Sequence, residues 1–328
     1  MADTIRFVRA DATPLSAERK GRRDDPRMAA RMVGLDADPA AADVAAVILG
    51  VADDRGVHLN GGRMGAADGP ARFRDYFSRL PVPAELELRC VVSAGDLMPA
   101  EHTGETHARL AEVVAVLRER FPFSRLVIVG GGHDHAYGEV LGLSRSLAKT
   151  PDARVAVCNI DAHADVRPHQ GEPHSGTPFR RILLEPATRV AGPSLLAWGL
   201  QAACNASLHL DFLRQQGCKV VMWQEIESDE HGAGAALVRD LHELALHHTG
   251  LALSVDMDAF AQSVAPGVSA PSPLGVPPGA VVLAAASLGH QTCATQLGIY
   301  ELNPRFDQDG ATARLAARIA WSYVTGLA

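Results

Sequence analysis

The stretch AVCNIDAHAD, residues 156–165, decides the fold, and the rest of the chain can be interpreted from it. Its apolar first half is typical of a buried β-strand that ends at about Ile160. Three possible metal ligands, Asp161, His163 and Asp165, follow at alternate positions. Because side chains at i and i+2 share one face of an extended backbone, we expect these three groups to converge just beyond the strand.

Two further stretches repeat this pattern of a buried strand that ends in polar side chains. LVIVGGGHD, residues 126–134, runs into three glycines and His133, and LALSVDMDAF, residues 251–260, carries Asp256 and Asp258 at the same i, i+2 spacing. Strands that alternate with helical segments form a parallel α/β sheet, in which ligands bind beyond the carboxyl ends of the strands. The sequence therefore predicts one site built from three strand ends.

The side chains that this site would bring together are four aspartates and two histidines, with no cysteine. Oxygen and imidazole ligands suit hard or borderline divalent ions such as Mn²⁺ better than a thiolate zinc site. Four crowded carboxylates would raise one another's pKa unless more than one positive charge lay between them. The pattern therefore favours a two-metal centre, whose ions would lower the pKa of a bridging water. Each motif alone could be a tight turn, a solvated loop or a helix cap, and only their joint occurrence favours metal binding.

The three motifs resemble the signatures of the ureohydrolase family of arginases, agmatinases and formimidoylglutamases. GG-x-H is matched by Gly130–His133, DAH-x-D by Asp161–Asp165, and S-x-D-x-D by Ser254–Asp258. The resemblance extends from the glycine-rich segment 61–74 to IYELNP, residues 299–304. It implies a three-layer α/β/α sandwich with a mostly parallel sheet, for which the apolar runs supply about eight strands.

The same resemblance, carried across position by position, implies two Mn²⁺ ions per subunit. One ion would be bound by His133, Asp161, Asp165 and Asp256, and the other by Asp161, His163, Asp256 and Asp258. Asp161 and Asp256 would then bridge the two ions.

Three side chains are candidates for catalysis. Asp258 could accept a proton from the bridging water and pass it to the departing amine. His174, in a loop rich in proline and glycine, resembles the proton-shuttling histidine of the family, and a solvated histidine is the alternative. Glu301, just past the last expected strand, resembles the carboxylate that pairs with the cationic end of the substrate. A capping or salt-bridging glutamate is the alternative there.

Departures from the arginase pattern favour an acidic substrate. Arginases and agmatinases carry DxDxxDP, but position 261 is alanine here, and the stretches AFAQSVAPGVSAP and SGTPFR resemble formimidoylglutamases. Arg167 lies where arginases have a neutral side chain, and a guanidinium can bind a carboxylate through two hydrogen bonds. Ser175 or the loop 263–279 could help to hold the carboxylates of such a substrate.

The resemblance therefore implies hydrolysis of the C–N bond of N-formimino-L-glutamate to L-glutamate and formamide, a step of histidine degradation. One alternative is another guanidino or amidino hydrolase, which would release urea from a guanidino acid or from agmatine. Others are a non-catalytic metal-binding relative and a zinc deacetylase with a single metal. The product released and the metal stoichiometry would separate these possibilities.

Length and motif spacing predict a single metallohydrolase domain. The chain has 328 residues, of which 47% are hydrophobic, which is ample for a buried sheet. We expect the domain to span residues 45–328, since the motifs extend to residue 304. The charged, alanine-rich residues 1–44 would form an N-terminal arm that packs on the body or on a neighbouring subunit.

Charge and cysteine content bound the partners and the compartment. A net charge of −7 without a basic patch argues against nucleic acid. Five scattered cysteines predict reduced thiols in a cytoplasmic protein, and no segment has the pattern of a signal peptide or a membrane span. The expected partner is a small amidino or guanidino amino acid, and the resemblance suggests a homo-oligomer.

Overall fold

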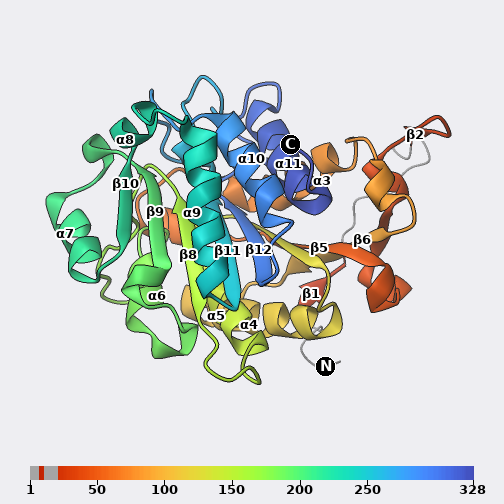
Figure 1. Cartoon of the computed structure of the whole chain (residues 1–328), viewed down its shortest axis with the longest axis horizontal. Coiled ribbons are helices and arrows are strands. Elements are labelled where there is room, and N and C mark those ends of the chain that lie inside the picture. Colours follow the sequence, from red (N-terminus) through yellow and green to blue (C-terminus); the bar gives the residue numbers. More distant parts are fainter. Residues whose placement is uncertain (1–6, 11–20) are drawn as a thin grey trace.

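The computed structural model describes residues 7–10 and 21–328. Its centre is a ten-stranded sheet in the order β1-β6-β5-β7-β12-β11-β8-β9-β10, with β4 also paired to β6. All the pairs in this sheet are parallel except β1 with β6. Helices cover both faces, as Figure 1 shows, so the predicted three-layer α/β/α sandwich is confirmed.

The strands expected from the apolar runs are all present. They are β5 (Val44–Val51), β6 (Cys90–Leu97), β7 (Arg125–Gly130), β8 (Val155–Ile160), β9 (Leu195–Leu200), β10 (Lys219–Met222), β11 (Gly250–Asp256) and β12 (Ala294–Tyr300). The central ones are buried along their whole length because helices lie on both sides of a parallel sheet.

Two short strands from the N-terminal segment make the sheet larger than predicted. β4 (Met32–Gly34) pairs with the first half of β6, and β1 (Val8–Arg9) pairs with its carboxyl end. A separate two-stranded hairpin joins β2 (Gly21–Arg22) to β3 (Asp25–Pro26). The described part of the expected arm 1–44 thus packs on the body, whereas residues 1–6 and 11–20 of that arm lie outside the described residues.

The helices form two layers. One layer contains α3 (Gly69–Phe77), α9 (Ala233–His247), α10 (Pro278–Leu288) and α11 (Ala311–Thr325), and the other contains α4 (Thr103–Arg120), α5 (Ala136–Ser146) and α6 (Pro178–Leu184). The shorter helices are α2 (Arg55–Leu59), α7 (Ser207–Gln215) and α8 (Trp223–Glu227). Proline in the first turn of α3, α6 and α10 has a φ that already suits a helix and needs no N–H there.

The hydrophobic core lies on both faces of the sheet, and β8 shows why. Ala156, Cys158 and Ile160 pack toward α9 and α10, whereas Val155 and Val157 pack toward α5. Alternate side chains of a strand point to opposite faces, so one apolar run fills both core layers. The candidate ligands Asp161, His163 and Asp165 then follow where this strand ends.

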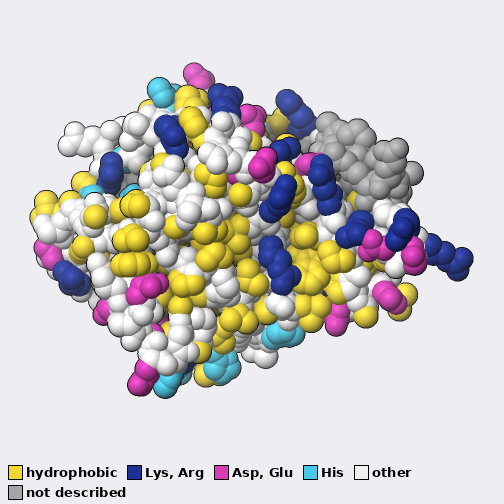
Figure 2. Space-filling model, turned by 90° about the horizontal axis from the view of Figure 1, so that it is seen from above, with side chains coloured by type: hydrophobic (Ala, Val, Ile, Leu, Met, Phe, Trp, Pro, Cys, Tyr) yellow, Lys and Arg dark blue, Asp and Glu magenta, His cyan; other side chains and the backbone are white. Residues whose placement is uncertain are grey.

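Figure 2 and the helix compositions describe the outside of the molecule. On the face shown in Figure 2, basic and acidic side chains are interspersed. Within the described residues, none of the helices is both long and apolar enough to cross a bilayer.

Candidate active site

All the candidate ligands lie beyond the carboxyl ends of adjacent central strands. His133 follows β7, Asp161 follows β8, and Asp256 is the last residue of β11. β12 lies between β7 and β11 in the sheet and is followed by Glu301. Three sequence-distant motifs and Glu301 therefore meet because four neighbouring parallel strands end side by side.

The ligand-type atoms form two groups. In the first group, the Nδ1 atom of His133 lies 2.9 Å from Asp256 Oδ2, 3.2 Å from Asp161 Oδ2 and 3.2 Å from Asp165 Oδ2. In the second group, the Nδ1 atom of His163 lies 3.3 Å from Asp161 Oδ1 and 3.3 Å from Asp258 Oδ2. Asp161 contributes one oxygen to each group and is placed to bridge them.

Asp256 has a ligand-type atom within 4.8 Å of the others in the first group alone. Its Oδ1 atom accepts a hydrogen bond of 2.7 Å from the backbone N–H of Asp258, which holds the carboxylate in place. Asp161 Oδ1 accepts the equivalent bond from His163 N, also at 2.7 Å. A bridging role for Asp256 remains a prediction.

Unpaired polar atoms show that these residues fit metal ions. His133 is fully buried, and its Nε2 atom lies 2.9 Å from Ser254 Oγ. Its Nδ1 atom makes no well-aligned hydrogen bond to any described residue, and the same holds for Asp258 Oδ1 and Glu301 Oε2. Buried polar atoms normally have partners. Ring nitrogens and carboxylate oxygens that converge in this way form a suitable donor set for two divalent cations.

The electrostatics of these side chains support the same conclusion. Burial raises the pKa of Asp258 to about 7, although the charge of His163 opposes the rise. Burial and the charges of Asp258 and Asp161 raise the pKa of Asp256 well above its usual range. Burial and the charge of Asp256 do the same to the pKa of Glu301. So much buried negative charge requires protons or cations, and divalent ions supply the latter.

A pocket of about 260 Å³ opens above the two groups. Its lining includes Asp165, His163, Asp256, Asp258 and Glu301. Its remaining polar lining comes from Asn60, Arg63, Arg167, Ser175, Cys204, Asn205, His209 and Ser269. A pocket lined by both acidic and basic side chains suits a small molecule with one cationic and one anionic end.

Glu301 is held in a strained backbone conformation, with a φ of 62°, and Asp165 has a φ of 48°. Side chains other than glycine rarely adopt positive φ, and such residues cluster at functional sites. Glu301 N donates to Gly131 O at 2.8 Å, and Glu301 Oε1 accepts from His133 N at 3.1 Å. These bonds fix the carboxylate next to His133 and leave Oε2 without a partner.

Arg167 and Ser175, predicted as substrate-binding residues, both line the pocket. Asn60 connects them, because its Oδ1 atom accepts a bond of 2.9 Å from Arg167 Nη1 and its Nδ2 atom donates to Ser175 Oγ at 3.0 Å. Arg167 is otherwise exposed to solvent. Its guanidinium therefore keeps N–H groups available for a ligand.

His174 does not line the pocket, although its chain neighbour Ser175 does. The ring is half-buried, and its Nδ1 atom accepts a hydrogen bond of 3.3 Å from Gly176 N. Burial, with the charge of Arg167, lowers the pKa of His174. Its role as a proton carrier remains a prediction.

Several lining residues were not singled out from the sequence. Arg63 lies in the glycine-rich segment 61–74 that carries part of the family resemblance, and Asn60 directly precedes it, so this segment is the only sequence signal for either residue. Arg63 donates to Ser269 O at 3.0 Å and to Val268 O at 2.7 Å, which fastens the loop 263–279 to the pocket. No sequence pattern identifies Ser269 or His209, because their positions depend on how the loops pack.

Comparisons with known proteins identify the family of this chain. Residues 44–326 match the Arginase family. The chain is 33% identical over 276 residues to a formimidoylglutamase of Geobacillus thermodenitrificans, covering 83% of this chain and 81% of that one. It is also 33% identical over 283 residues to a formimidoylglutamase of Rhodococcus jostii, covering 86% and 85% of the two chains.

A solved structure is similar as well. The formiminoglutamase of Trypanosoma cruzi, determined with Mn²⁺, matches with a TM-score of 0.80 and 29% identity, covering 92% of this chain and 98% of that one. The family predicted from the three motifs is therefore confirmed.

Proposed function

This chain belongs to the arginase family, and from that premise we propose that it is a binuclear manganese hydrolase specific for N-formimino-L-glutamate. It would cleave the C–N bond to yield L-glutamate and formamide. The relatives that are a third identical over most of the chain are formimidoylglutamases, and the similar solved structure contains Mn²⁺. The single observation that carries the proposal is the pocket, which is lined by both Glu301 and Arg167.

We assign the ions to the two groups of side chains described above. The first group, His133, Asp161, Asp165 and Asp256, would hold one ion, and the second group, Asp161, His163 and Asp258, would hold the other. Asp256 would be a further ligand of the second ion, as predicted from the sequence. When bound, two divalent ions lower the pKa of water and so supply a nucleophile at neutral pH. The remaining steps fall to the side chains of the protein.

Glu301 and Asp258 would manage charge and protons at the reacting carbon. Glu301 Oε2, which has no hydrogen-bond partner, is placed to accept an N–H of the amidinium. Asp258 Oδ1 is likewise unpaired and would accept a proton and deliver it to the departing amine of glutamate. Carboxyl groups that a pocket holds without partners are suited to both tasks.

The anionic end of the substrate would be bound on the opposite side of the pocket. Arg167 would bind a carboxylate, with Ser175 as an additional hydrogen-bond donor. We also propose His174 as a proton carrier, since it directly precedes Ser175 in the chain. Its lowered pKa would leave the imidazole neutral near pH 7 and able to accept a proton.

The setting of the enzyme is also part of the proposal. We infer a cytoplasmic homo-oligomer in which residues 45–328 form the catalytic domain. All five cysteines are free, and the described part of segment 1–44 adds two edge strands to the sheet. Gel filtration with light scattering would determine the oligomeric state.

The test is product release by the Mn²⁺-loaded protein. We expect formamide and glutamate from N-formimino-L-glutamate, and no urea from arginine, agmatine or guanidino acids. Urea from a guanidino acid would keep the metal centre and change the substrate. No turnover on any substrate, with two ions bound, would contradict the proposal and favour a non-catalytic relative.

A further inference from the structure

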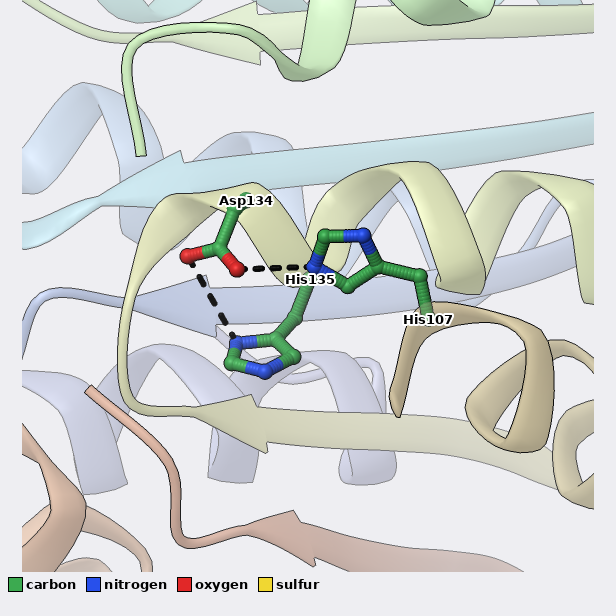
Figure 3. Close-up of side chains that lie close together, drawn as sticks. All are labelled: His107, Asp134 and His135. Carbon is green, nitrogen blue, oxygen red and sulfur yellow. Dashed lines mark hydrogen bonds and ion pairs between the residues drawn. The ribbon is translucent and has the colours of Figure 1, made fainter. Parts of the chain in front are cut away.

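A second buried cluster of polar side chains lies behind the turn that carries His133. Figure 3 shows its centre, which consists of His107 from α4 and of Asp134 and His135 from the turn after β7. His107 and His135 are fully buried, and Asp134 is 1% exposed. None of the three lines the pocket, so the proposed reaction does not use them directly.

The hydrogen bonds of this cluster define the state of the His107 ring. Arg181 Nη1 donates to His107 Nδ1 at 2.7 Å, so the ring carries its proton on Nε2. His107 Nε2 then donates to Asp134 Oδ2, also at 2.7 Å. Burial lowers the pKa of His107, which agrees with a neutral ring. The chain Arg181–His107–Asp134 thus joins α6 to the turn with one defined direction of donation.

The cluster resembles a metal site at first sight, because ligand-type atoms of the three residues lie within 4.8 Å of one another. The bonds argue against an ion there. Both nitrogens of His107 are occupied, and His135 Nδ1 donates to Gly132 O at 2.9 Å. The guanidinium of Arg181 adds a positive charge at the ring. We therefore interpret the cluster as a support for the turn.

Asp134 has little freedom to move within this support. A Cβ atom on Gly56 would lie 2.1 Å from Asp134 Oδ1, and one on Gly132 would lie 2.4 Å from it. Two glycines thus provide the space that the carboxylate fills. A side chain at either position would have to displace the Asp134 carboxylate.

The turn itself is fastened from two sides. On the pocket side, His133 N donates to Glu301 Oε1 at 3.1 Å. On the far side, Asp134 is the link to α4 through His107. His133 lies between these two anchors, so the direction of its Nδ1 atom depends on both. Side chains that orient a metal ligand in this way commonly change metal affinity when they are replaced.

We propose that His107 is a positioning residue of the metal centre. Acting through Asp134, it holds His133 in place and so sets the affinity of the first group for its ion, while leaving the second group unaffected. This inference rests on the proposed function, because it presumes that the first group binds Mn²⁺.

The test compares Mn²⁺ binding by the metal-free wild-type protein and by variants, with free Mn²⁺ counted by its electron paramagnetic resonance signal. We expect His107→Leu to lower the affinity for one of the two ions by about 10–100-fold. The affinity for the other ion should change by less than roughly threefold. His107→Gln retains an N–H where Nε2 lies and should restore most of the lost affinity.

Arg181→Met provides a second variant in case the buried leucine prevents folding, since Arg181 is partly exposed. It removes the donor to His107 Nδ1 and should lower the affinity for the same ion to a smaller extent. His248→Leu is the matched control. His248 is half-buried and bonded to Leu244 O and Ser194 Oγ, at the amino ends of the strands, so both ions should bind as in the wild type.

The outcomes separate this inference from the proposed function. Two ions in the wild type, with both unchanged or both equally weakened in the His107 and Arg181 variants, would overturn the inference alone. Failure of the wild-type protein to bind two ions would overturn both. If His107→Gln bound the ion as weakly as His107→Leu, a role that depends on the hydrogen bond to Asp134 would also be refuted.

Discussion

The two carboxylate oxygens of Glu301 have different surroundings. One oxygen is part of the hydrogen bonding of the fold, and the other is available to a ligand. Oε1 accepts the backbone N–H of His133, whereas Oε2 is buried without a partner. An unpaired buried carboxylate oxygen is costly unless a ligand satisfies it. The positive φ of Glu301 adds strain that the fold would not retain for packing alone.

Replacing Glu301 with glutamine tests this interpretation. The amide keeps the shape and can still accept from His133 N, but it presents an N–H or a neutral oxygen to the amidinium. We expect kcat/KM for N-formimino-L-glutamate to fall by about 100-fold, as for the loss of a buried charge-assisted hydrogen bond. Steady-state kinetics and Mn²⁺ stoichiometry should be measured together.

The stoichiometry is the internal control for Glu301→Gln, because Glu301 belongs to neither group of proposed ligands. Two ions should remain bound. Loss of an ion would show that Glu301 acts as a ligand, and unchanged kinetics would show that Oε2 does not contact the substrate.

At the level of elements, the sequence predicts the strands well and the loops poorly. β5 to β12 are apolar runs of four to eight residues, and their carboxyl ends must lie together in a parallel sheet. β1 and β4 have two and three residues, which is too short for a pattern to be visible.

The pocket illustrates the same limit. The metal-ligand motifs follow directly from strand ends, whereas Ser269 and His209 reach the pocket through loop paths set by tertiary contacts such as the bonds of Arg63. His174 shows the reverse case. Its position in the chain next to Ser175 predicts proximity, but its Nδ1 atom accepts a local bond from Gly176 N, which directs the ring, while its backbone N–H donates to Thr177 Oγ1.

The loop 166–178 carries Arg167 into the pocket, and its contribution can be measured by Arg167→Ala. Loss of the guanidinium that would hydrogen-bond to the substrate carboxylate should raise KM by about 10–100-fold with a smaller change in kcat. The matched control is Arg180→Ala. Arg180 is close in sequence and stacks on Phe212, but it does not line the pocket, so KM should change by roughly twofold at most. Equal effects of the two substitutions would contradict a specific role for Arg167.

In the molecule as a whole, a cluster of buried carboxyl groups lies where the central strands of the sheet end. Without bound metal ions, these groups lower the stability of the folded protein. Burial raises the pKa of Asp165, Asp256, Asp258 and Glu301 above their ordinary values. The folded state therefore binds more protons than the unfolded state above about pH 4, and its stability falls as the pH rises. For Asp258 this loss extends to about pH 7, where the folded carboxyl titrates.

The histidines of the site act in the same direction. Burial alone would lower the pKa of His133, but its contacts with Asp161, Asp165 and Asp256 raise it well above 6.5. The charge of Asp258 raises the pKa of His163. A folded histidine that keeps its proton while the unfolded one loses it contributes stability that disappears at high pH. The lowered pKa of Asp161 has the opposite sign, yet Asp161 is ionised in both states above pH 5 and so does not affect the higher range.

Mn²⁺ should therefore stabilise the protein more at high pH than at low pH, since the ions replace protons that the acid cluster otherwise needs. With free Mn²⁺ about 100-fold above Kd, the unfolding midpoint at pH 8 should rise by roughly 5–10 °C per tightly bound ion, and chelation should reverse the shift. At pH 5.5 the protons compete with the ions, and the shift should be smaller. Differential scanning calorimetry at the two pH values, with Ca²⁺ as a control for ionic strength and charge, measures both effects. Equal shifts at both pH values would mean either that the buried carboxyls keep their protons when the ions bind or that the ions bind elsewhere. Either result would contradict the assignment of the two groups as the metal centre.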